Sequence, residues 1–284
     1  MPNRFCGIVN SIAHLYGNFN RKCYTLFTVC QIVSPPREQR QCLRAPLDIL
    51  PQGGYYVNRT PFGDERLKVN YQKEMEAVIA ALPEEARPSL LLQCCCAPCS
   101  SAVLEVLCAH FDVSIYFYNP NIHPRAEYEK RLRQFDKLLP AAPFAKGVRQ
   151  IRTDYDPAEF FDAVKGLEAE PEGGARCAEC FRLRLRATAE KARALGFDFF
   201  TTTLTVSPHK DAAILNELGK EIGEEIGVRF LPSDFKKKEG YKRSIALSKA
   251  YDLYRQTDCG CIFSKREESG DENFPASADI GASI

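Results

Sequence analysis

Short apolar runs alternate with segments of helical periodicity through most of this 284-residue chain. The apolar runs suit buried strands and lie at residues 89–92, 113–118, 148–151, 197–202 and 228–231. The helical patterns lie at residues 70–82, from 98 to about 111, and at 125–139, 157–165, 178–195, 210–226 and 244–254, with Pro140 expected to end the third helix. Strands that alternate with helices form a mostly parallel sheet covered on both faces. We therefore predict one α/β domain with a helical C-terminal part.

The two ends of the chain differ from this pattern. Residues 1–47 carry six basic residues and one acidic residue, without the apolar run and cleavage site of a signal peptide. We expect residues 1–66 to be a poorly ordered extension, or the product of a start codon assigned too far upstream. Residues 265–284 are rich in Glu, Asp, Ser, Gly and Ala, which predicts a disordered tail. The folded domain is therefore expected at residues 67–264.

The composition excludes several classes of protein. No stretch approaches the roughly 20 apolar residues that span a bilayer, so we expect no membrane-spanning segment. The formal net charge is +1, so any basic surface for nucleic acid must be local. The phosphate-binding loop and the motifs of zinc metalloproteases and serine hydrolases are absent from the sequence.

Cysteine is the unusual component of the sequence. The chain has 13 cysteines, and eight of them form three tight groups after residue 90. Secreted disulfide scaffolds are usually much shorter, whereas clustered cysteines in a large globular chain more often bind metal or perform redox chemistry. This usage indicates a reducing, cytoplasmic compartment.

The first group follows the first predicted strand directly and comprises Cys94, Cys95, Cys96 and Cys99. Ligands of parallel sheets bind outside the carboxyl ends of strands, and a helix N-terminus stabilises thiolates. Thiolates select soft metals, chiefly zinc, copper(I) or iron–sulfur clusters. Cys94 could instead face the packing of the strand, and Cys108 falls on the apolar face of the next helix.

The second group, Cys177 and Cys180, is a CxxC pair at the start of a predicted helix. Together with Cys95 and Cys96 it offers four thiolates from two helix N-termini. Four cysteines suit a [4Fe–4S] cluster and equally a structural zinc ion. The position at the expected active-site edge favours the cluster.

The third group is Cys259-Gly260-Cys261. Two cysteines separated by one glycine can close a small disulfide ring, and a strained ring is easily reduced. The pair is a candidate two-electron relay. Two further metal ligands, or two idle thiols, are the alternatives.

Candidate substrate-binding residues lie in a basic segment flanked by aromatic residues. Lysine and arginine neutralise phosphates, and aromatic rings stack on unpaired bases, as RNA-binding sites require. A solvated surface loop is an equally good interpretation. The basic residues are Lys236, Lys237, Lys238, Lys242 and Arg243. Residues 201–211 offer hydroxyls and helix N–H groups at the same sheet edge.

Several of these motifs, taken in order, resemble the QueH family of epoxyqueuosine reductases. The resemblance runs from about residue 69 to 263. It rests on residues 70–74, the CCAPC turn at 95–99, and residues 118–124, 127–131, 165–180, 203–211, 234–244 and 254–256 ahead of the CGC triplet. A run of long motifs in one order is more specific than any single CxxC pair.

The resemblance implies a cytoplasmic, cobalamin-independent reductase with a Rossmann-like, nucleotide-alpha-hydrolase-like fold. Such an enzyme reduces epoxyqueuosine to queuosine at the wobble position of tRNA, the last step of queuosine biosynthesis, with electrons from a donor that the sequence does not identify. By the same resemblance, Cys95, Cys96, Cys177 and Cys180 match the ligands of a [4Fe–4S] cluster, and Cys259 and Cys261 match a redox-active disulfide. Some members hold an additional mononuclear iron through an Asp, where this chain offers Cys99.

Two alternative functions remain at this point. One is a tRNA sulfur transferase on the same scaffold, although the turn after the first strand holds cysteines where such an enzyme needs a phosphate loop. The other is a zinc-bound RNA-binding module, which would contain zinc without iron or sulfide.

Overall fold

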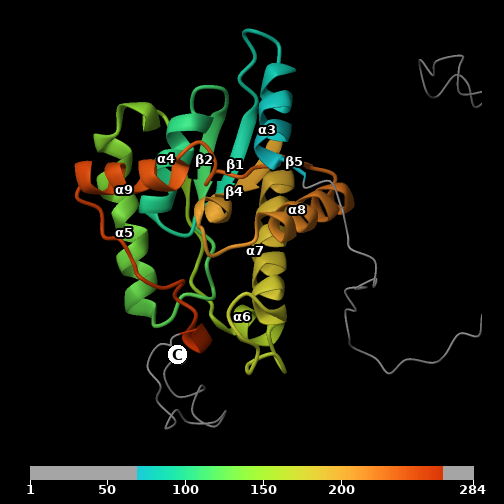
Figure 1. Ribbon diagram of the computed structural model, residues 1–284, viewed down its shortest axis with the longest axis vertical. Coiled ribbons are helices and arrows are strands. Elements are labelled where there is room, and N and C mark those ends of the chain that lie inside the picture. The colour runs from blue at the N-terminus through green and yellow to red at the C-terminus, as the bar shows by residue number, and fades with distance from the viewer. Residues whose placement is uncertain (1–68, 265–284) are drawn as a thin grey trace, which may run out of the picture. The chain divides into compact units, whose positions relative to one another are not determined.

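Five parallel strands form one sheet in the order β3-β2-β1-β4-β5 (Figure 1). The computed structural model describes residues 69–264, so the predictions for residues 1–66 and 265–284 fall outside the described part of the chain. The strands are β1 (Ser89–Gln93), β2 (Asp112–Tyr116), β3 (Arg149–Ile151), β4 (Phe199–Thr202) and β5 (Arg229–Phe230). The predicted α/β architecture with a parallel sheet is confirmed.

Helices connect the strands and follow the predicted order. They are α3 (Tyr71–Ala80), α4 (Ala97–Leu107), α5 (Arg125–Ala141), α6 (Ala158–Ala163), α7 (Ala175–Leu195), α8 (Ala212–Ile226) and α9 (Gly240–Ala250). Two short 3-10 helices, η2 (Pro143–Ala145) and η3 (Thr203–Val206), complete the described elements. Among the described residues, no helix has both the length and the apolar character needed to cross a membrane.

The side chains of β1 divide between two apolar cores. Leu90 and Leu92 are fully buried in one core, with residues of α3, α4 and α5. Leu91 is fully buried in the other core, with residues of α7 and α8. Successive side chains of a strand point to opposite faces, so this division places helices on both faces of the sheet. The short apolar run in the sequence is thus a central strand buried on both sides.

Several helix boundaries differ from the sequence predictions, and three helices show the physical reasons or bear on the site. Helix α5 continues to Ala141 because Pro140 lies in its last turn, where a missing N–H removes only one helical bond. Helix α7 begins at Ala175, which brings Cys177 into its first turn. Helix α9 spans Gly240–Ala250 and not residues 244–254. A Cβ at Gly240 would lie 1.8 Å from the backbone oxygen of Phe235, so only glycine allows the helix to begin there.

Candidate active site

The strand order reverses direction between β1 and β4. The chain builds β1, β2 and β3 toward one edge and then returns to place β4 and β5 on the other side of β1. In open parallel sheets such a switch point opens a crevice at the carboxyl ends of the strands. Cys95 follows the end of β1, and its backbone N–H donates to Thr203 Oγ1, just after β4, at 3.4 Å. The first cysteine group therefore lies at the switch point.

Cys95, Cys96 and Cys99 form a compact trio of thiols. Their sulfur atoms lie within 4.8 Å of one another, and in the described part of the chain no other three or more Cys, His, Asp or Glu side chains come together in this way. Cys96 is the N-cap of α4, and its Sγ accepts the backbone N–H of Cys99 at 3.4 Å. Gln256 also donates to Cys96 Sγ at 2.8 Å, which ties the C-terminal segment to this turn.

Cys94 does not belong to the trio. Its side chain is fully buried in the core beneath the sheet, and its thiol donates to the carbonyl of Leu92 at 3.4 Å. Burial raises the pKa of this thiol well above its ordinary value, because the core disfavours a thiolate. Cys94 therefore packs as a small apolar residue.

Cys177 and Cys180 lie in the first turns of α7. The backbone N–H of Gly173 donates to Cys177 Sγ at 3.2 Å, and Cys180 is buried. This pair is not part of the compact trio. It lines a cavity of about 130 Å³, hereafter the smaller cavity, together with Cys259 and Cys261.

The CGC triplet brings the third pair of sulfurs to the same place. Gly260 has φ +89°, a backbone conformation that favours glycine. The backbone N–H of Cys261 lies 3.5 Å from Cys259 Sγ, and the Ser264 hydroxyl lies 3.6 Å from that sulfur. None of the nine cysteines in the described part of the chain forms a disulfide.

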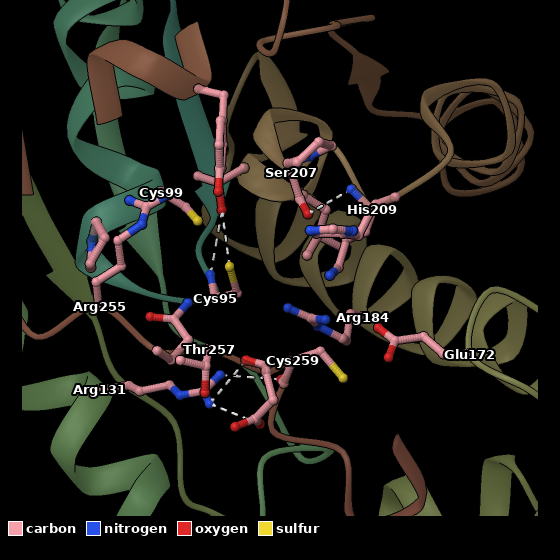
Figure 2. Close-up of a pocket in the computed structure, with 18 residues that line it drawn as sticks. Cys95, Cys99, Arg131, Glu172, Arg184, Ser207, His209, Arg255, Thr257 and Cys259 are labelled. Atoms are coloured by element: carbon pink, nitrogen blue, oxygen red, sulfur yellow. Dashed lines mark hydrogen bonds and ion pairs between the residues drawn. The ribbon is translucent and has the colours of Figure 1, made fainter. Parts of the chain in front are cut away.

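A larger cavity, of about 420 Å³, lies beside Cys95 and Cys99. Figure 2 shows the side chains that line it. Its volume lies in the range of about 300–1,000 Å³ that is typical of small-molecule sites. Cys95, Cys99 and Cys259 line it, although they are distant in the sequence. Its basic residues are Arg131, Arg184, His209, Lys210 and Arg255.

The larger and smaller cavities adjoin each other. Five residues line both of them: Glu172, Arg184, His209, Lys210 and Cys259. Sulfur atoms from three separate segments of the chain therefore converge on one region at the carboxyl edge of the sheet. Such a meeting of thiols is suited to soft-metal binding and to thiol–disulfide chemistry.

The thiols of the trio do not ionise equally. Hydrogen bonds from Cys96 and Cys99 lower the pKa of Cys95 well below its ordinary value. Burial, followed by the hydrogen bond to Cys95, raises the pKa of Cys96 to about 12. Hydrogen bonds to Cys95 and Cys96 raise the pKa of Cys99. The Cys95 thiolate thus accepts hydrogen bonds from the thiols of Cys96 and Cys99. A soft metal bound by the trio would displace these thiol protons.

The CGC pair is polarised in the same manner. A hydrogen bond from Cys261 is the largest influence that lowers the pKa of Cys259 to about 6, although burial opposes it. The pKa of Cys261 is raised by that hydrogen bond and by burial. Cys259 is therefore the nucleophilic sulfur of the pair near neutral pH.

The five basic residues of the basic segment lie outside both cavities, although Tyr241 of the same segment lines the larger one. Lys236 pairs with Asp234 at 3.0 Å, and Lys238 pairs with Glu76. Lys242 pairs with Glu239 at 2.5 Å, and Arg243 pairs with Glu105 at 2.6 Å. Neither these four residues nor Lys237 lines either cavity. Their predicted contact with tRNA therefore stays a prediction about the surface of the protein.

Three arginines line the larger cavity although the sequence predicted no role for them. Arg131 is 1% exposed, and it donates to the backbone oxygens of Cys259 at 3.2 Å and Asp258 at 3.3 Å. Arg255 donates to the hydroxyls of Ser244 and Ser248, each at 3.3 Å. The third arginine is Arg184. Arg131 and Arg255 lie inside motifs of the family resemblance, which was the one indication available.

The fold and the site define an α/β protein with a thiol-rich centre at the switch point of a parallel sheet. A family model described as "Epoxyqueuosine reductase QueH" matches residues 90–267. A protein of that name from Streptococcus pyogenes is 42% identical over 207 residues, which cover 72% of this chain and 81% of the relative.

Two further relatives with the same name extend the comparison. The protein from Staphylococcus epidermidis is 41% identical over 209 residues, covering 72% of this chain and 88% of the relative. The protein from Thermotoga maritima is 38% identical over 182 residues, covering 63% of this chain and 91% of the relative. The chain belongs to the QueH family of epoxyqueuosine reductases, and it is an oxidoreductase. This membership favours the reductase over the sulfur transferase and the zinc-bound module.

Proposed function

We propose that this chain reduces epoxyqueuosine to queuosine at the wobble position of tRNA, with a [4Fe–4S] cluster and the Cys259/Cys261 pair as its redox groups. The observation that carries the proposal is the convergence of three cysteine groups, distant in the sequence, around two adjoining cavities. The family membership supplies the substrate class.

Cys95, Cys96, Cys177 and Cys180 would hold the cluster, and Cys99 would contribute to an additional iron. The donor set fits, because these residues supply sulfur from two helix N-termini at the mouth of the switch point. Hydrogen bonds to ligand sulfurs are a feature of iron–sulfur sites, and Gln256 and Gly173 already donate to Cys96 and Cys177. When bound, the cluster would supply single electrons.

Cys259 and Cys261 would supply the two electrons of one turnover. Loss of the epoxide oxygen as water consumes two electrons and two protons. Oxidation of the Cys259 thiolate and the Cys261 thiol to one disulfide releases two electrons and one proton, and solvent supplies the second proton. The low pKa of Cys259 keeps one sulfur ionised, whereas Cys261 retains its proton. An external donor of reducing equivalents then restores the dithiol.

The larger cavity would receive the modified base after it leaves the anticodon stack. Enzymes that act on a base extrude it into a pocket and bind the flanking phosphates with basic side chains. Three basic residues line the cavity and could bind these phosphates, namely His209, Lys210 and Arg255. The basic residues predicted from the sequence do not line it. Lys236, Lys237, Lys238, Lys242 and Arg243 would then act farther out, on the phosphates of the tRNA stem.

Anaerobic purification with iron and sulfide quantitation tests this division of labour. C177A should lose most of the iron and sulfide, because a ligand is removed. C259A should retain both but lose product formation on tRNA that contains epoxyqueuosine, because the pair that supplies the two electrons is broken. C108A is the matched control, since Cys108 lies at the end of α4 and outside the two cavities, and it should change neither quantity.

Two results would contradict the proposal. Equal loss of iron in C259A and C177A would show that the CGC pair binds metal. Zinc without iron or sulfide in the wild-type protein, together with no product from the modified tRNA, would remove the reductase mechanism altogether.

A further inference from the structure

Arg184 is a buried cation beside the thiols. Its side chain comes from α7 and the residue is only 3% exposed. It lines both the larger and the smaller cavity, and Figure 2 shows its guanidinium group pointing into the space between Cys95 and Cys259. Its charge is thus directed at the region where the cysteine groups meet.

No carboxylate among residues 69–264 forms an ion pair with Arg184, and its Nε has no hydrogen-bond partner there. Removing a charge from water costs several kcal/mol unless an opposite charge compensates it. The other fully or nearly buried arginine of the larger cavity, Arg131, does have such a partner in Glu127 at 2.7 Å. Within the described residues, Arg184 therefore has no paired carboxylate to compensate its buried charge.

The position of Arg184 is fixed by a network of neutral residues. Its Nη2 donates to Asn119 Oδ1 at 2.6 Å. Asn119 donates to the backbone oxygen of Cys94 at 2.8 Å, and Gln93 donates to the same Asn119 oxygen at 3.2 Å. Gln93 and Asn119 are almost completely buried and neither carries a charge. The network holds the guanidinium at the end of β1 without neutralising it.

Arg184 borders cysteines of both pairs. It lines the larger cavity with Cys95 and the smaller cavity with Cys177 and Cys180. Its charge is therefore placed to act on sulfur atoms of both pairs.

We infer that Arg184 is the counter-charge of the thiolate-bound redox centre and sets its reduction potential. The inference rests on the proposed function, because it requires a cluster held by Cys95, Cys96, Cys177 and Cys180. Four thiolates give the centre a net negative charge that grows by one on reduction. A fixed cation nearby stabilises the reduced form more than the oxidised form, since the attraction scales with the charge.

The test is an anaerobic potentiometric titration of the iron–sulfur absorbance and of the signal of the reduced cluster in electron paramagnetic resonance. In R184Q the ratio of reduced to oxidised cluster at a fixed potential should fall about tenfold, which is about 59 mV for one electron. R184K keeps the charge and should stay within about threefold of the wild-type ratio. Iron and sulfide per chain are measured in every sample, so that only loaded proteins are compared.

Arg186 provides a matched control on the same helix. It is more exposed than Arg184 and already forms a two-point ion pair with Glu225, at 2.8 and 2.5 Å. R186Q should leave the ratio unchanged. N119D tests the charge of Arg184 in a second way. It places a carboxylate beside Arg184 and cancels its charge without removing the side chain. Its ratio should fall at least as far as that of R184Q, and it serves where R184Q fails to fold.

The outcomes separate this inference from the proposed function. Wild-type protein without iron and sulfide overturns both. A loaded wild-type protein with an unchanged potential in R184Q, or in N119D where R184Q is not recovered, overturns the role of Arg184 alone. A fall in R184K as large as that in R184Q would also overturn it, because the geometry of the side chain and not its charge would then matter.

Discussion

The ionisation of Cys259 gives a sharp test of the CGC pair, because the thiol should titrate near pH 6 in the reduced protein. The hydrogen bond from Cys261 is the main cause of this lowered pKa. The charge of Lys210, the backbone N–H of Cys261 and the hydroxyl of Ser264 add to it, and burial acts against them. An ordinary cysteine has a pKa of about 8.5.

The choice of pH decides whether the effect can be seen. At pH 7 a pKa of about 6 raises the thiolate fraction roughly 30-fold over that of an ordinary cysteine. A thiolate of lower pKa is also a weaker nucleophile, and a Brønsted slope of about 0.45 removes roughly 13-fold. The net gain at pH 7 is only about twofold by this reckoning, whereas at pH 5.5 it is roughly 18-fold. The midpoint of the profile is therefore the informative quantity.

Alkylation with iodoacetamide under anaerobic, reducing conditions measures that midpoint. Trypsin releases residues 256–265 as one peptide, and fragment ions distinguish Cys259 from Cys261 within it. Cys108 is an internal reference, because burial raises its pKa to about 11 and it should not react below about pH 9. S264A and K210M should each move the Cys259 midpoint upward.

A midpoint of 8 or above for Cys259, or equal profiles for Cys259 and Cys261, would refute this account. The same shift has a consequence for stability. The folded pKa of Cys259 lies below its unfolded value of about 8.5, so the thiolate stabilises the fold fully above that value. The contribution is lost as the pH falls through about 6.

Three further predictions concern the fold and the site. G260A should destabilise the protein by about 1–2 kcal/mol in urea unfolding, since φ is +89° and a Cβ would lie 3.0 Å from Ile122 Cγ1; G147A, at φ +90° with open space, should cost less. N216A should cost about 3 kcal/mol in the same assay, because its amide makes three buried hydrogen bonds, to Ala212 and Ser233. C99A should lower the measured ratio of iron to sulfide while sulfide stays constant, because Cys99 is assigned to the additional iron and not to the cluster.

Much of the fold could be predicted because a strand that is buried on both faces can be recognised from a short apolar run in the sequence. The run Leu90-Leu91-Leu92 is apolar on both faces, and such a run between two helical patterns is a central parallel strand. The cysteines that follow it then lie at the carboxyl edge, where the structure has them. The boundaries of α9 were wrong because they depend on Glu239, with φ +64°, and on a backbone contact between Gly240 and Phe235 that no periodicity reveals.

The cationic part of the site could not be predicted for a different reason. Arg184 occurs in a helix with many other charged residues, and its burial follows from the packing of α7 against β1 and β4 and not from its neighbours in sequence. The basic segment stood out in the sequence, yet Glu76 and Glu105, which pair with Lys238 and Arg243, are remote in sequence. A count of basic residues cannot tell which charges are already compensated.

Cys259 lines both the larger and the smaller cavity, which bears on how electrons could pass through the site. Cys259 borders the cavity that would hold the substrate and also the cavity lined by Cys177 and Cys180. In the proposed mechanism, electron transfer to the substrate and electron transfer from the cluster could therefore both pass through Cys259. Arg131 holds the backbone of Cys259 through its carbonyl, and Gly260 accepts no Cβ without contact to Ile122 or Arg131. The CGC turn is thus restrained by the hydrogen bond from Arg131 and by close packing at Gly260. If the pair cycles between dithiol and disulfide as proposed, this restraint would help the cavity to keep its shape during the cycle.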